Sequence, residues 1–210
     1  MMQNSVFCMV VSRTRLIQAI ACFLSLYKNM DNFKVYILCV DEKCYEFLKE
    51  INLDKIVLVT IAELNREDLL AIKASRKLNQ YCWTLKPGFI KHIFTLDDSI
   101  NRVTYIDSDL FFYQNPNVIF ENQPDASVLL SSGEIFLPMY SKEFNQTMQT
   151  LTGNFNSGFI SFKKDINGLQ CVNWWDKMCV DSCTSNPEDN KFGDQKYLDD
   201  MPFLFNNVYE

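Results

Sequence analysis

The segment Val103-Thr104-Tyr105-Ile106-Asp107-Ser108-Asp109-Leu110-Phe111-Phe112 decides the fold. Val103 to Ile106 form an apolar run of β-branched and aromatic side chains, which predicts a buried strand. Two carboxylates, Asp107 and Asp109, follow with a spacing of two residues. Two carboxylates at a strand end repel each other, and each loses favourable hydration when it is buried. A divalent cation that binds oxygen ligands reduces both the repulsion and the cost of desolvation. The spacing alone leaves two interpretations open, a metal-diphosphate site or a polar turn that leaves the strand.

Working outward from this strand, the first 60 residues alternate buried apolar runs with helical periodicity. This alternation predicts an α/β fold with a mostly parallel central sheet flanked by helices. We expect the runs around Val6, Val35, Val57 and Val103 to be central strands. The expected strands are 5–11, 34–40, 55–60, 103–106, 126–131 and 159–162, with an extended end at 206–209, and the expected helices are 16–27, 42–51, 61–78, 87–94, 140–151, 169–179 and 196–204.

Length and charge restrict the function further. With 210 residues and 48% hydrophobic side chains, the chain is long enough for one domain with a sizeable core. Its net charge of −6 argues against a nucleic-acid-binding protein, which needs a basic surface. The sequence contains no apolar run of 18 residues and no pattern of a signal peptide at its start, so we expect a cytoplasmic protein.

The eight cysteines do not form a recognisable framework. There is no CxxC pair, and His92 is the single histidine. Cys179 and Cys183 have helical spacing, but no second pair completes a zinc site. We therefore expect free, reduced thiols.

Three further features follow along the chain. Pro87 suits the first turn of a helix, which would place Lys86 near a helix N-terminus that favours anions, unless Lys86 is an ordinary solvated lysine. The segment 153–158 is rich in small residues, which allows close approach of a ligand or marks a simple entry into a strand. Asp194 is suited to cap the helix expected over 196–204, and 187–191 reads as a polar loop.

Three motifs stand in order, namely Tyr105-Ile106-Asp107-Ser108-Asp109, Asn156-Ser157-Gly158-Phe159 and Gly193-Asp194-Gln195. Together with the Rossmann-like opening, they resemble glycosyltransferases of the GT-A fold, above all glycosyltransferase family 8 and related nucleotide-diphospho-sugar transferases. The resemblance extends from the first strand to Leu204. The Asp-x-Asp motif alone is weak, whereas the ordered triple is considerably more specific.

The resemblance implies transfer of a sugar, with retention, from a nucleotide-diphosphate-sugar donor, usually a UDP-sugar, to a glycan or lipid-linked acceptor. It also implies a cofactor, Mn²⁺ or Mg²⁺, and is compatible with peripheral membrane association. The implied metal ligands are Asp107 and Asp109. The implied donor-binding residues are Val11, Ser12, Lys86, Asp107, Ser108, Ser157 and Gly158. The implied catalytic residues beside the anomeric carbon are Asn156, Asp194 and Gln195.

The sequence departs from the family at two places. Ser12-Arg13-Thr14 stands where the family has an acidic and an aromatic residue, which leaves the base preference open. The family's C-terminal segment, with a metal-binding histidine and a lysine, has no counterpart before Glu210. We therefore expect residues 1–210 to form a single glycosyltransferase-like domain without that segment, with weak donor binding and slow transfer.

Two other classes of function compete with a transferase. A non-catalytic module that binds sugar nucleotides would carry the same motifs. A haloacid-dehalogenase-type phosphatase also has a strand followed by Asp-x-Asp. Those enzymes, however, usually have Thr or Val at the position of Phe111, and their motif usually lies near the N-terminus.

Overall fold

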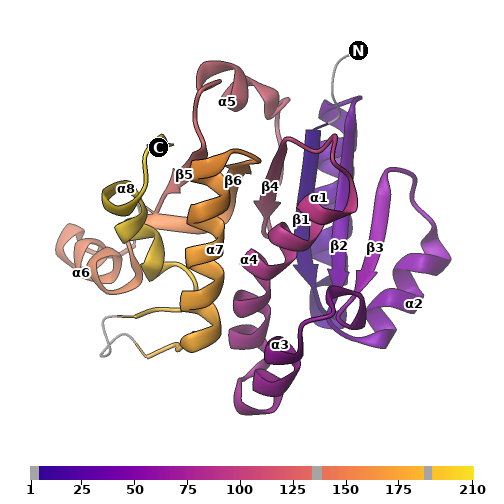
Figure 1. Cartoon of the computed structure of the whole chain (residues 1–210), viewed down its shortest axis with the longest axis horizontal. Coiled ribbons are helices and arrows are strands. Elements are labelled where there is room, and N and C mark those ends of the chain that lie inside the picture. The colour runs from indigo at the N-terminus through magenta and orange to yellow at the C-terminus, as the bar shows by residue number, and fades with distance from the viewer. Residues whose placement is uncertain (1–4, 134–138, 187–190) are drawn as a thin grey trace.

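The computed structural model describes residues 5–133, 139–186 and 191–210, and its centre is a seven-stranded sheet with the order β3-β2-β1-β4-β6-β5-β7 (Figure 1). β6 runs antiparallel to both of its neighbours, and the other paired strands are parallel. The mostly parallel α/β fold expected from the sequence is therefore confirmed. The strands are β1 Ser5–Val11, β2 Phe33–Cys39, β3 Ile56–Thr60, β4 Arg102–Ile106, β5 Val128–Ser132, β6 Phe155–Lys163 and β7 Val208–Tyr209.

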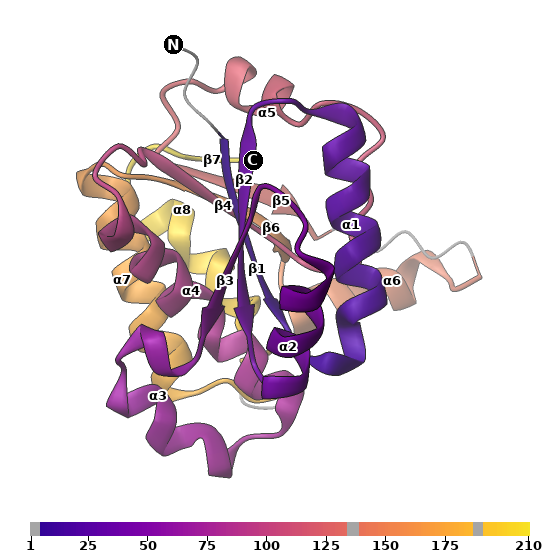
Figure 2. The ribbon, with the colours of Figure 1, turned by 90° about the vertical axis from the view of Figure 1, so that its right-hand side faces the viewer.

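Helices cover both faces of the sheet, as Figures 1 and 2 show together. α1 and α2 bury their apolar sides in a core on one face, and α3, α4 and α7 bury theirs in a larger core on the other. The α-helices are α1 Leu16–Asn29, α2 Glu42–Ile51, α3 Glu67–Ile72, α4 Leu78–Leu96, α5 Asn117–Asn122, α6 Lys142–Thr152, α7 Ile166–Asp181 and α8 Met201–Leu204. None of the helices among the described residues is long and apolar enough to cross a membrane.

Alternation along β1 determines which of its side chains reach each face, since successive side chains of a strand point to opposite sides. Val6, Cys8 and Val10 pack into the core under α4 and α7. Phe7 and Val11 belong to the opposite core, under α1 and α2. The candidate site lies on the α4 side of the sheet, so the side chains of β1 that can reach it are those that point toward α4.

Two expectations about position were wrong. The run around Val57 forms β3, which is an edge strand rather than a central one. Its burial pattern is mostly intermediate, in agreement with an edge position. The second concerns α4, which begins at Leu78, so Pro87 lies inside the helix and not in its first turn. Lys86 is consequently a mid-helix residue, and the anion-binding helix start expected beside it does not exist.

Several boundaries also differ from the expectations. The stretch 61–78 is not one helix, because short 3-10 turns at Ala62–Leu64 and Lys73–Ser75 flank α3. The stretch 196–204 is a 3-10 helix, Lys196–Asp200, that continues into α8. The extended end at 206–209 forms β7, which pairs with β5 in parallel. Most of the polar loop expected at 187–191 lies outside the described residues.

Candidate active site

A cleft opens at the carboxyl ends of β1 and β4, where open α/β sheets bind ligands. It consists of two joined cavities of ≈260 Å³ and ≈520 Å³, which we call the β6-side cavity and the β1-side cavity. Trp83, Lys86, Asp107 and Asp109 line both. The β6-side cavity is also lined by Leu110, Asn156, Ser157, Gly158, Phe192, Gly193, Asp194 and Gln195, and the β1-side cavity by Val10, Ser12, Thr14, Arg15, Leu78, Asn79, Cys82, Tyr105 and Ser108.

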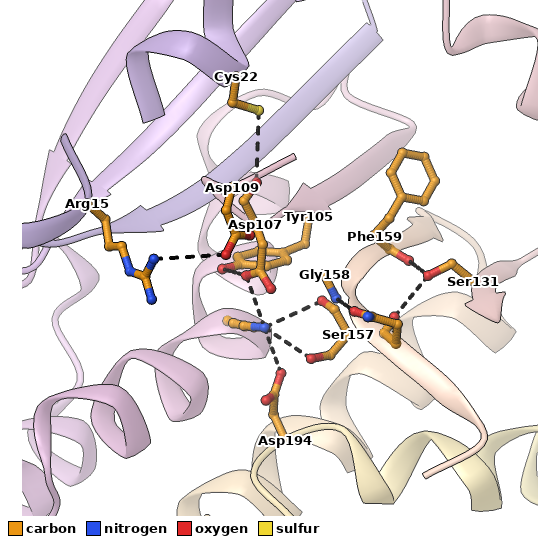
Figure 3. Close-up of polar contacts among 12 residues, drawn as sticks. Arg15, Cys22, Tyr105, Asp107, Asp109, Ser131, Ser157, Gly158, Phe159 and Asp194 are labelled. Atoms are coloured by element: carbon orange, nitrogen blue, oxygen red, sulfur yellow. Dashed lines mark hydrogen bonds and ion pairs between the residues drawn. The ribbon is translucent and has the colours of Figure 1, made fainter. Parts of the chain in front are cut away.

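A buried lysine lies at the centre of this cleft. The Nζ atom of Lys86 is 3.2 Å from Asp107 Oδ1 and 3.1 Å from Asp194 Oδ2. The same amine donates a hydrogen bond of 3.1 Å to the Ser157 hydroxyl. These three partners, which Figure 3 labels, come from the residue after β4, from β6 and from the segment before the 3-10 helix 196–200. One cation thus joins all three motifs found in the sequence.

The electrostatics of this cluster follow from burial and from charge. Side-chain exposure is 3% for both Lys86 and Asp194, but 36% for Asp107. Burial by itself would lower the pKa of Lys86, yet the carboxylates of Asp107 and Asp194 outweigh it and raise that pKa. Burial raises the pKa of Asp194, while the nearby Lys86 opposes the increase. The lysine is therefore a permanent cation that favours the ionised form of Asp194.

Asp194 does not cap a helix, contrary to the expectation from the sequence. No side-chain hydrogen bond caps the 3-10 helix at Lys196–Asp200, because the Asp194 carboxylate turns into the cleft toward Lys86. Its main-chain oxygen accepts a hydrogen bond of 2.9 Å from the indole N–H of Trp175 in α7. Its Oδ2 atom is buried and lies 3.1 Å from the Lys86 amine, with which it forms an ion pair. Asp194 thus lines the β6-side cavity with its carboxylate held by Lys86.

The residue before Asp194 explains how the chain turns at this point. Gly193 has a φ of +56°, which favours glycine, and a Cβ atom there would lie 3.1 Å from the ring of Trp83. The rings of Trp83 and Phe192 lie 6.2 Å apart and form an aromatic wall of the β6-side cavity. The glycine thus lets the chain bend around the tryptophan and directs Asp194 inward.

The two carboxylates after β4 lie in different surroundings. Asp107 Oδ1 accepts a hydrogen bond of 2.9 Å from the buried Tyr105 hydroxyl in addition to its contact with Lys86. Its main-chain N–H donates to Gly158 O at 2.7 Å, which fixes the strand end against β6. The Asp109 side chain is 60% exposed and lies 4.0 Å from Arg15. Asp107 is therefore held in place, whereas Asp109 faces the open part of the cleft.

The segment at the start of β6 closes the cleft on the other side. Asn156 Oδ1 accepts a hydrogen bond of 2.7 Å from the Gly158 N–H. A Cβ atom on Gly158 would lie 2.9 Å from Asp107 Oδ2, and 2.8 Å from Asn156 Oδ1. The missing side chain keeps the space beside Asp107 Oδ2 open, as close approach of a ligand requires.

These residues fit a divalent cation that arrives with further ligands. Among the described residues, no third His, Cys, Asp or Glu joins Asp107 and Asp109 in a cluster that could hold a metal. Two carboxylates next to an open space supply hard oxygen ligands and leave the other coordination positions to a bound diphosphate and water, an arrangement typical of Mg²⁺ sites. Asp107 Oδ2, beside the space left by Gly158, and the exposed carboxylate of Asp109 are the atoms that would hold it.

The structure brings most of the predicted site residues together and separates one. Val11 is buried in the core under α1 and α2, and Val10 takes its expected place at the cleft because of strand alternation. Ser12 lies at the cleft with its hydroxyl 2.9 Å from that of Thr14. Ser108 lines the β1-side cavity, and Gln195 lines the β6-side cavity while its side-chain amide donates to Thr152 O.

Three cleft residues on α4, Asn79, Cys82 and Trp83, were not predicted from the sequence, although Lys86 on the same helix was. Asn79, Cys82, Trp83 and Lys86 follow one another at intervals of three, one and three residues and lie on one face of the helix. This helical spacing was visible in the sequence and would have grouped them, had the helix been expected to begin before Pro87.

The fold and the cleft at its strand ends define a glycosyltransferase of the GT-A type. Residues 32–202 match the family model of the nucleotide-diphospho-sugar transferases, so the chain belongs to this family. The family membership also removes the basis for the phosphatase interpretation.

Two curated relatives come from Bacillus subtilis (strain 168). The uncharacterized protein YfnF is 47% identical over 205 residues, which cover 98% of this chain and 68% of YfnF. The uncharacterized protein YfnD is 32% identical over 208 residues, which cover 97% of this chain and 64% of YfnD. The chain thus spans about two thirds of the length of these relatives.

Solved structures of glycosyltransferases share the fold. Apo mouse xyloside xylosyltransferase 1 superimposes with a TM-score of 0.62 at 16% identity, over 99% of this chain and 84% of that chain. The galactosyltransferase LgtC, in complex with donor and acceptor sugar analogs, gives a TM-score of 0.59 at 13% identity, over 97% of this chain and 72% of that chain. At these identities the likeness establishes the fold alone.

Proposed function

We propose that this protein transfers a sugar, with retention at the anomeric carbon, from a UDP-sugar to a hydroxyl of a glycan or a lipid-linked acceptor. Asp107 and Asp109 hold a divalent cation, Mn²⁺ or Mg²⁺, together with the donor diphosphate. The observation that carries the proposal is the buried Lys86 amine between Asp107 and Asp194, at the junction of two cavities. Membership of the nucleotide-diphospho-sugar transferase family supports it.

The two cavities divide the donor between them. The β1-side cavity is the larger, and its hydroxyl, amide and guanidinium groups suit a nucleoside. The β6-side cavity is bounded by an aromatic wall and by the carboxylate of Asp194, which suits a sugar ring. The diphosphate then lies between them, beside Asp107 and Asp109, because these residues line both cavities.

The reaction breaks the bond between the anomeric carbon and the diphosphate oxygen and forms a bond from that carbon to the acceptor oxygen. The acceptor proton passes to the leaving diphosphate on the same face of the sugar, so that atoms and charges balance. When bound, the divalent cation supplies charge stabilisation to the leaving diphosphate. Lys86 adds a fixed positive charge in a buried setting, where electrostatic interactions are strong.

Asp194 acts on the sugar side of the reaction. As the anomeric carbon gains positive charge, a nearby carboxylate oxygen stabilises it. Asp194 lines the β6-side cavity, and the ion pair with Lys86 holds its carboxylate in place there. Asn156 and Gln195 complete this wall with amide groups, of which Asn156 orients Gly158 through its own hydrogen bond.

The proposal is tested by incubating the protein with Mn²⁺ and a panel of UDP-, GDP- and ADP-sugars, with and without glycan acceptors. Release of the nucleoside diphosphate is measured by chromatography. We expect release from a UDP-sugar that increases with a suitable acceptor and falls about 100-fold in Asp107→Asn, since one electrostatic contact at a reacting centre is worth about this much. Asp98→Asn, at an exposed carboxylate outside the cleft, is the matched control.

Two outcomes would contradict the proposal. Tight binding of UDP-sugars without release under any acceptor would favour the non-catalytic binding module. Release that is equal in the wild type and in Asp107→Asn would place the reaction elsewhere in the molecule.

A further inference from the structure

The side chain of Tyr105 contacts both charged groups at the centre of the cleft. Its hydroxyl donates a hydrogen bond of 2.9 Å to Asp107 Oδ1 (Figure 3). The Lys86 amine lies over its ring, 4.8 Å from the ring centre, which is within the range of a cation–π interaction. A single aromatic side chain therefore meets the carboxylate through its polar end and the lysine through its face.

Tyr105 occupies a rigid part of the molecule. It belongs to β4, which lies in the interior of the sheet between β1 and β6. Its register partners are Cys8 in β1 and Ile160 in β6, and all three residues are buried. Close packing around a side chain with few torsions leaves the hydroxyl little freedom to move. Tyr105 can therefore hold a neighbouring group in a fixed orientation.

The two carboxylate oxygens of Asp107 lie in different surroundings. Oδ1 accepts the hydrogen bond from Tyr105 and also lies 3.2 Å from the Lys86 amine. A metal ion at Oδ1 would compete with the hydroxyl for the lone pairs and would be repelled by the positive amine. Oδ2 lies on the side where Gly158 leaves space, since a Cβ atom there would approach it to 2.9 Å. Oδ2 is thus the oxygen that a cation can reach.

Asp109 is held less firmly than Asp107. Its side chain is 60% exposed, and its ion pair with Arg15 is long, at 4.0 Å, and involves an arginine that is itself 55% exposed. Such exposed pairs contribute little to stability, so they restrict a carboxylate only weakly. Of the two ligands that would hold the cation, Asp107 is therefore the fixed one and Asp109 the adaptable one.

We propose that Tyr105 is a positioning residue that limits Asp107 to binding the divalent cation through Oδ2 alone. This role rests on the cation site of the proposed function and adds a preference among cations to it. Mg²⁺ demands near-ideal octahedral geometry, and Mn²⁺ also takes octahedral oxygen sites. Ca²⁺ accepts up to about eight oxygen ligands and binds a carboxylate through one oxygen or both. A fixed carboxylate that offers one oxygen therefore favours Mn²⁺ and Mg²⁺ over Ca²⁺.

The test is titration calorimetry of UDP into the wild type and Tyr105→Phe, with Mn²⁺, with Ca²⁺ and with EDTA. Phenylalanine keeps the ring beside Lys86 and removes only the hydroxyl. The wild type should bind UDP at least tenfold more tightly with Mn²⁺ than with Ca²⁺. In Tyr105→Phe we expect the affinity with Mn²⁺ to fall about tenfold, because a hydrogen bond to a charged group is lost. The affinity with Ca²⁺ should fall less than threefold, since Ca²⁺ tolerates a carboxylate that is free to turn.

Tyr197→Phe is the matched control. Tyr197 is 5% exposed and its hydroxyl donates a hydrogen bond of 2.8 Å to Ser182 O, so this change also removes a hydroxyl hydrogen bond from the interior. It should leave the affinity for UDP unchanged with either cation. Circular dichroism should show that both variants are folded.

The outcomes separate this role from the cation site itself. A wild type that requires Mn²⁺ for UDP binding, together with an equal affinity in Tyr105→Phe, would overturn the positioning role and leave the cation site intact. A parallel fall with Mn²⁺ and Ca²⁺ would also overturn it, because a merely structural role lowers both. UDP binding by the wild type that is the same in EDTA would overturn the cation site and this role with it.

Discussion

At the residue scale, the site depends on a buried cation held between two carboxylates. Lys86 and Asp194 are both almost inaccessible to water, so neither can lose its partner without leaving an isolated charge in the interior. This places the lysine under a structural demand as well as a functional one. The effects on stability and on activity can be separated. Removing both charges leaves no isolated charge in the interior, but it does not restore the function of the lysine.

Lys86→Met is expected to lower the free energy of unfolding by about 3 kcal/mol, because the carboxylate of Asp194 remains buried without a cation. The double variant Lys86→Met, Asp194→Asn should recover most of this loss, yet it should stay inactive in the sugar-nucleotide assay. Urea denaturation of the two variants and the wild type measures the effect. A double variant as unstable as the single one would show that the pair does not act as a unit.

His92 allows a simple test of pH dependence, because it is the only histidine of the chain. Burial lowers its pKa from the ordinary 6.5, although the Coulombic effect of Glu63 opposes this. The folded state thus binds this proton less readily than the unfolded state, so stability is lost as the pH falls below about 6.5. We expect the melting temperature to fall less between pH 7.5 and pH 5.5 in His92→Gln than in the wild type. Identical decreases would exclude this contribution.

The family resemblance of three short motifs was sufficient to group most of the polar residues that line the cleft, whereas spacing alone left a polar turn equally open. Asp107, Asp109, Asn156, Gly158 and Asp194 all line the cleft, as the three motifs predicted. What they do not reveal is a contact between distant residues, such as the ion pair of Asp194 with Lys86. For this reason a capping role was assigned to Asp194, because a cap is a local interaction that sequence alone can suggest.

At the element scale, α4 shows how burial overrides local preference. A proline inside a helix removes a hydrogen bond and costs about 3 kcal/mol. α4 nevertheless continues through Pro87, because several large apolar side chains on it are fully buried and each contributes about 1.5–3 kcal/mol. These are Tyr81, Leu85, Phe89, Ile90 and Ile93. Because proline favours the first turn of a helix, the sequence analysis expected this helix to begin at Pro87. α4 begins nine residues earlier, at Leu78.

The position of β3 at the sheet edge was missed for a related reason. An apolar run of five residues indicates a strand, but the order of strands is set by helices and crossovers that the run itself does not contain. Only the partial burial of β3 distinguishes it from β2, and burial is a property of the folded chain. The existence of the strands was therefore predictable from the sequence, whereas their order was not.

Trp175 in α7 is the residue through which one helix positions Asp194. Trp175→Phe should keep the stacking on Phe162 but lose the hydrogen bond to Asp194 O. Because the carbonyl is then buried without its donor, we expect a loss of about 1.5 kcal/mol in urea denaturation. We also expect about a tenfold decrease in kcat. The matched control is Trp174→Phe, whose ring makes edge contacts with Tyr197 and Phe205, and it should retain kcat.

At the scale of the whole molecule, a second buried carboxylate joins the helical layer on the side of the cleft. Asp176 Oδ2 in α7 lies 2.9 Å from Arg66 before α3 and 2.7 Å from Lys91 in α4. The absence of a side chain at Gly88 leaves room for its other oxygen, since a Cβ atom there would lie 3.2 Å from Asp176 Oδ1. The network thus connects three helices of the layer that carries Lys86.

Asp176→Ala is expected to lower the free energy of unfolding by about 2 kcal/mol, less than for a fully buried pair because both cations are partly exposed to water. Lys177→Ala, at the exposed neighbouring position, should change it by less than about 0.5 kcal/mol. Chemical denaturation gives both values. Equal stability of Asp176→Ala and the wild type would mean that apolar packing alone holds the three helices together.

The central claim is that the cleft binds a nucleoside diphosphate through a cation held by Asp107 and Asp109. Titration calorimetry of UDP into the protein, with Mn²⁺ or with EDTA, tests it most directly. We predict binding that requires Mn²⁺ and that is at least tenfold weaker in Asp109→Asn, a variant at a largely exposed side chain that leaves the fold intact. UDP affinity that is the same with EDTA as with Mn²⁺, and the same in the variant as in the wild type, would contradict the claim.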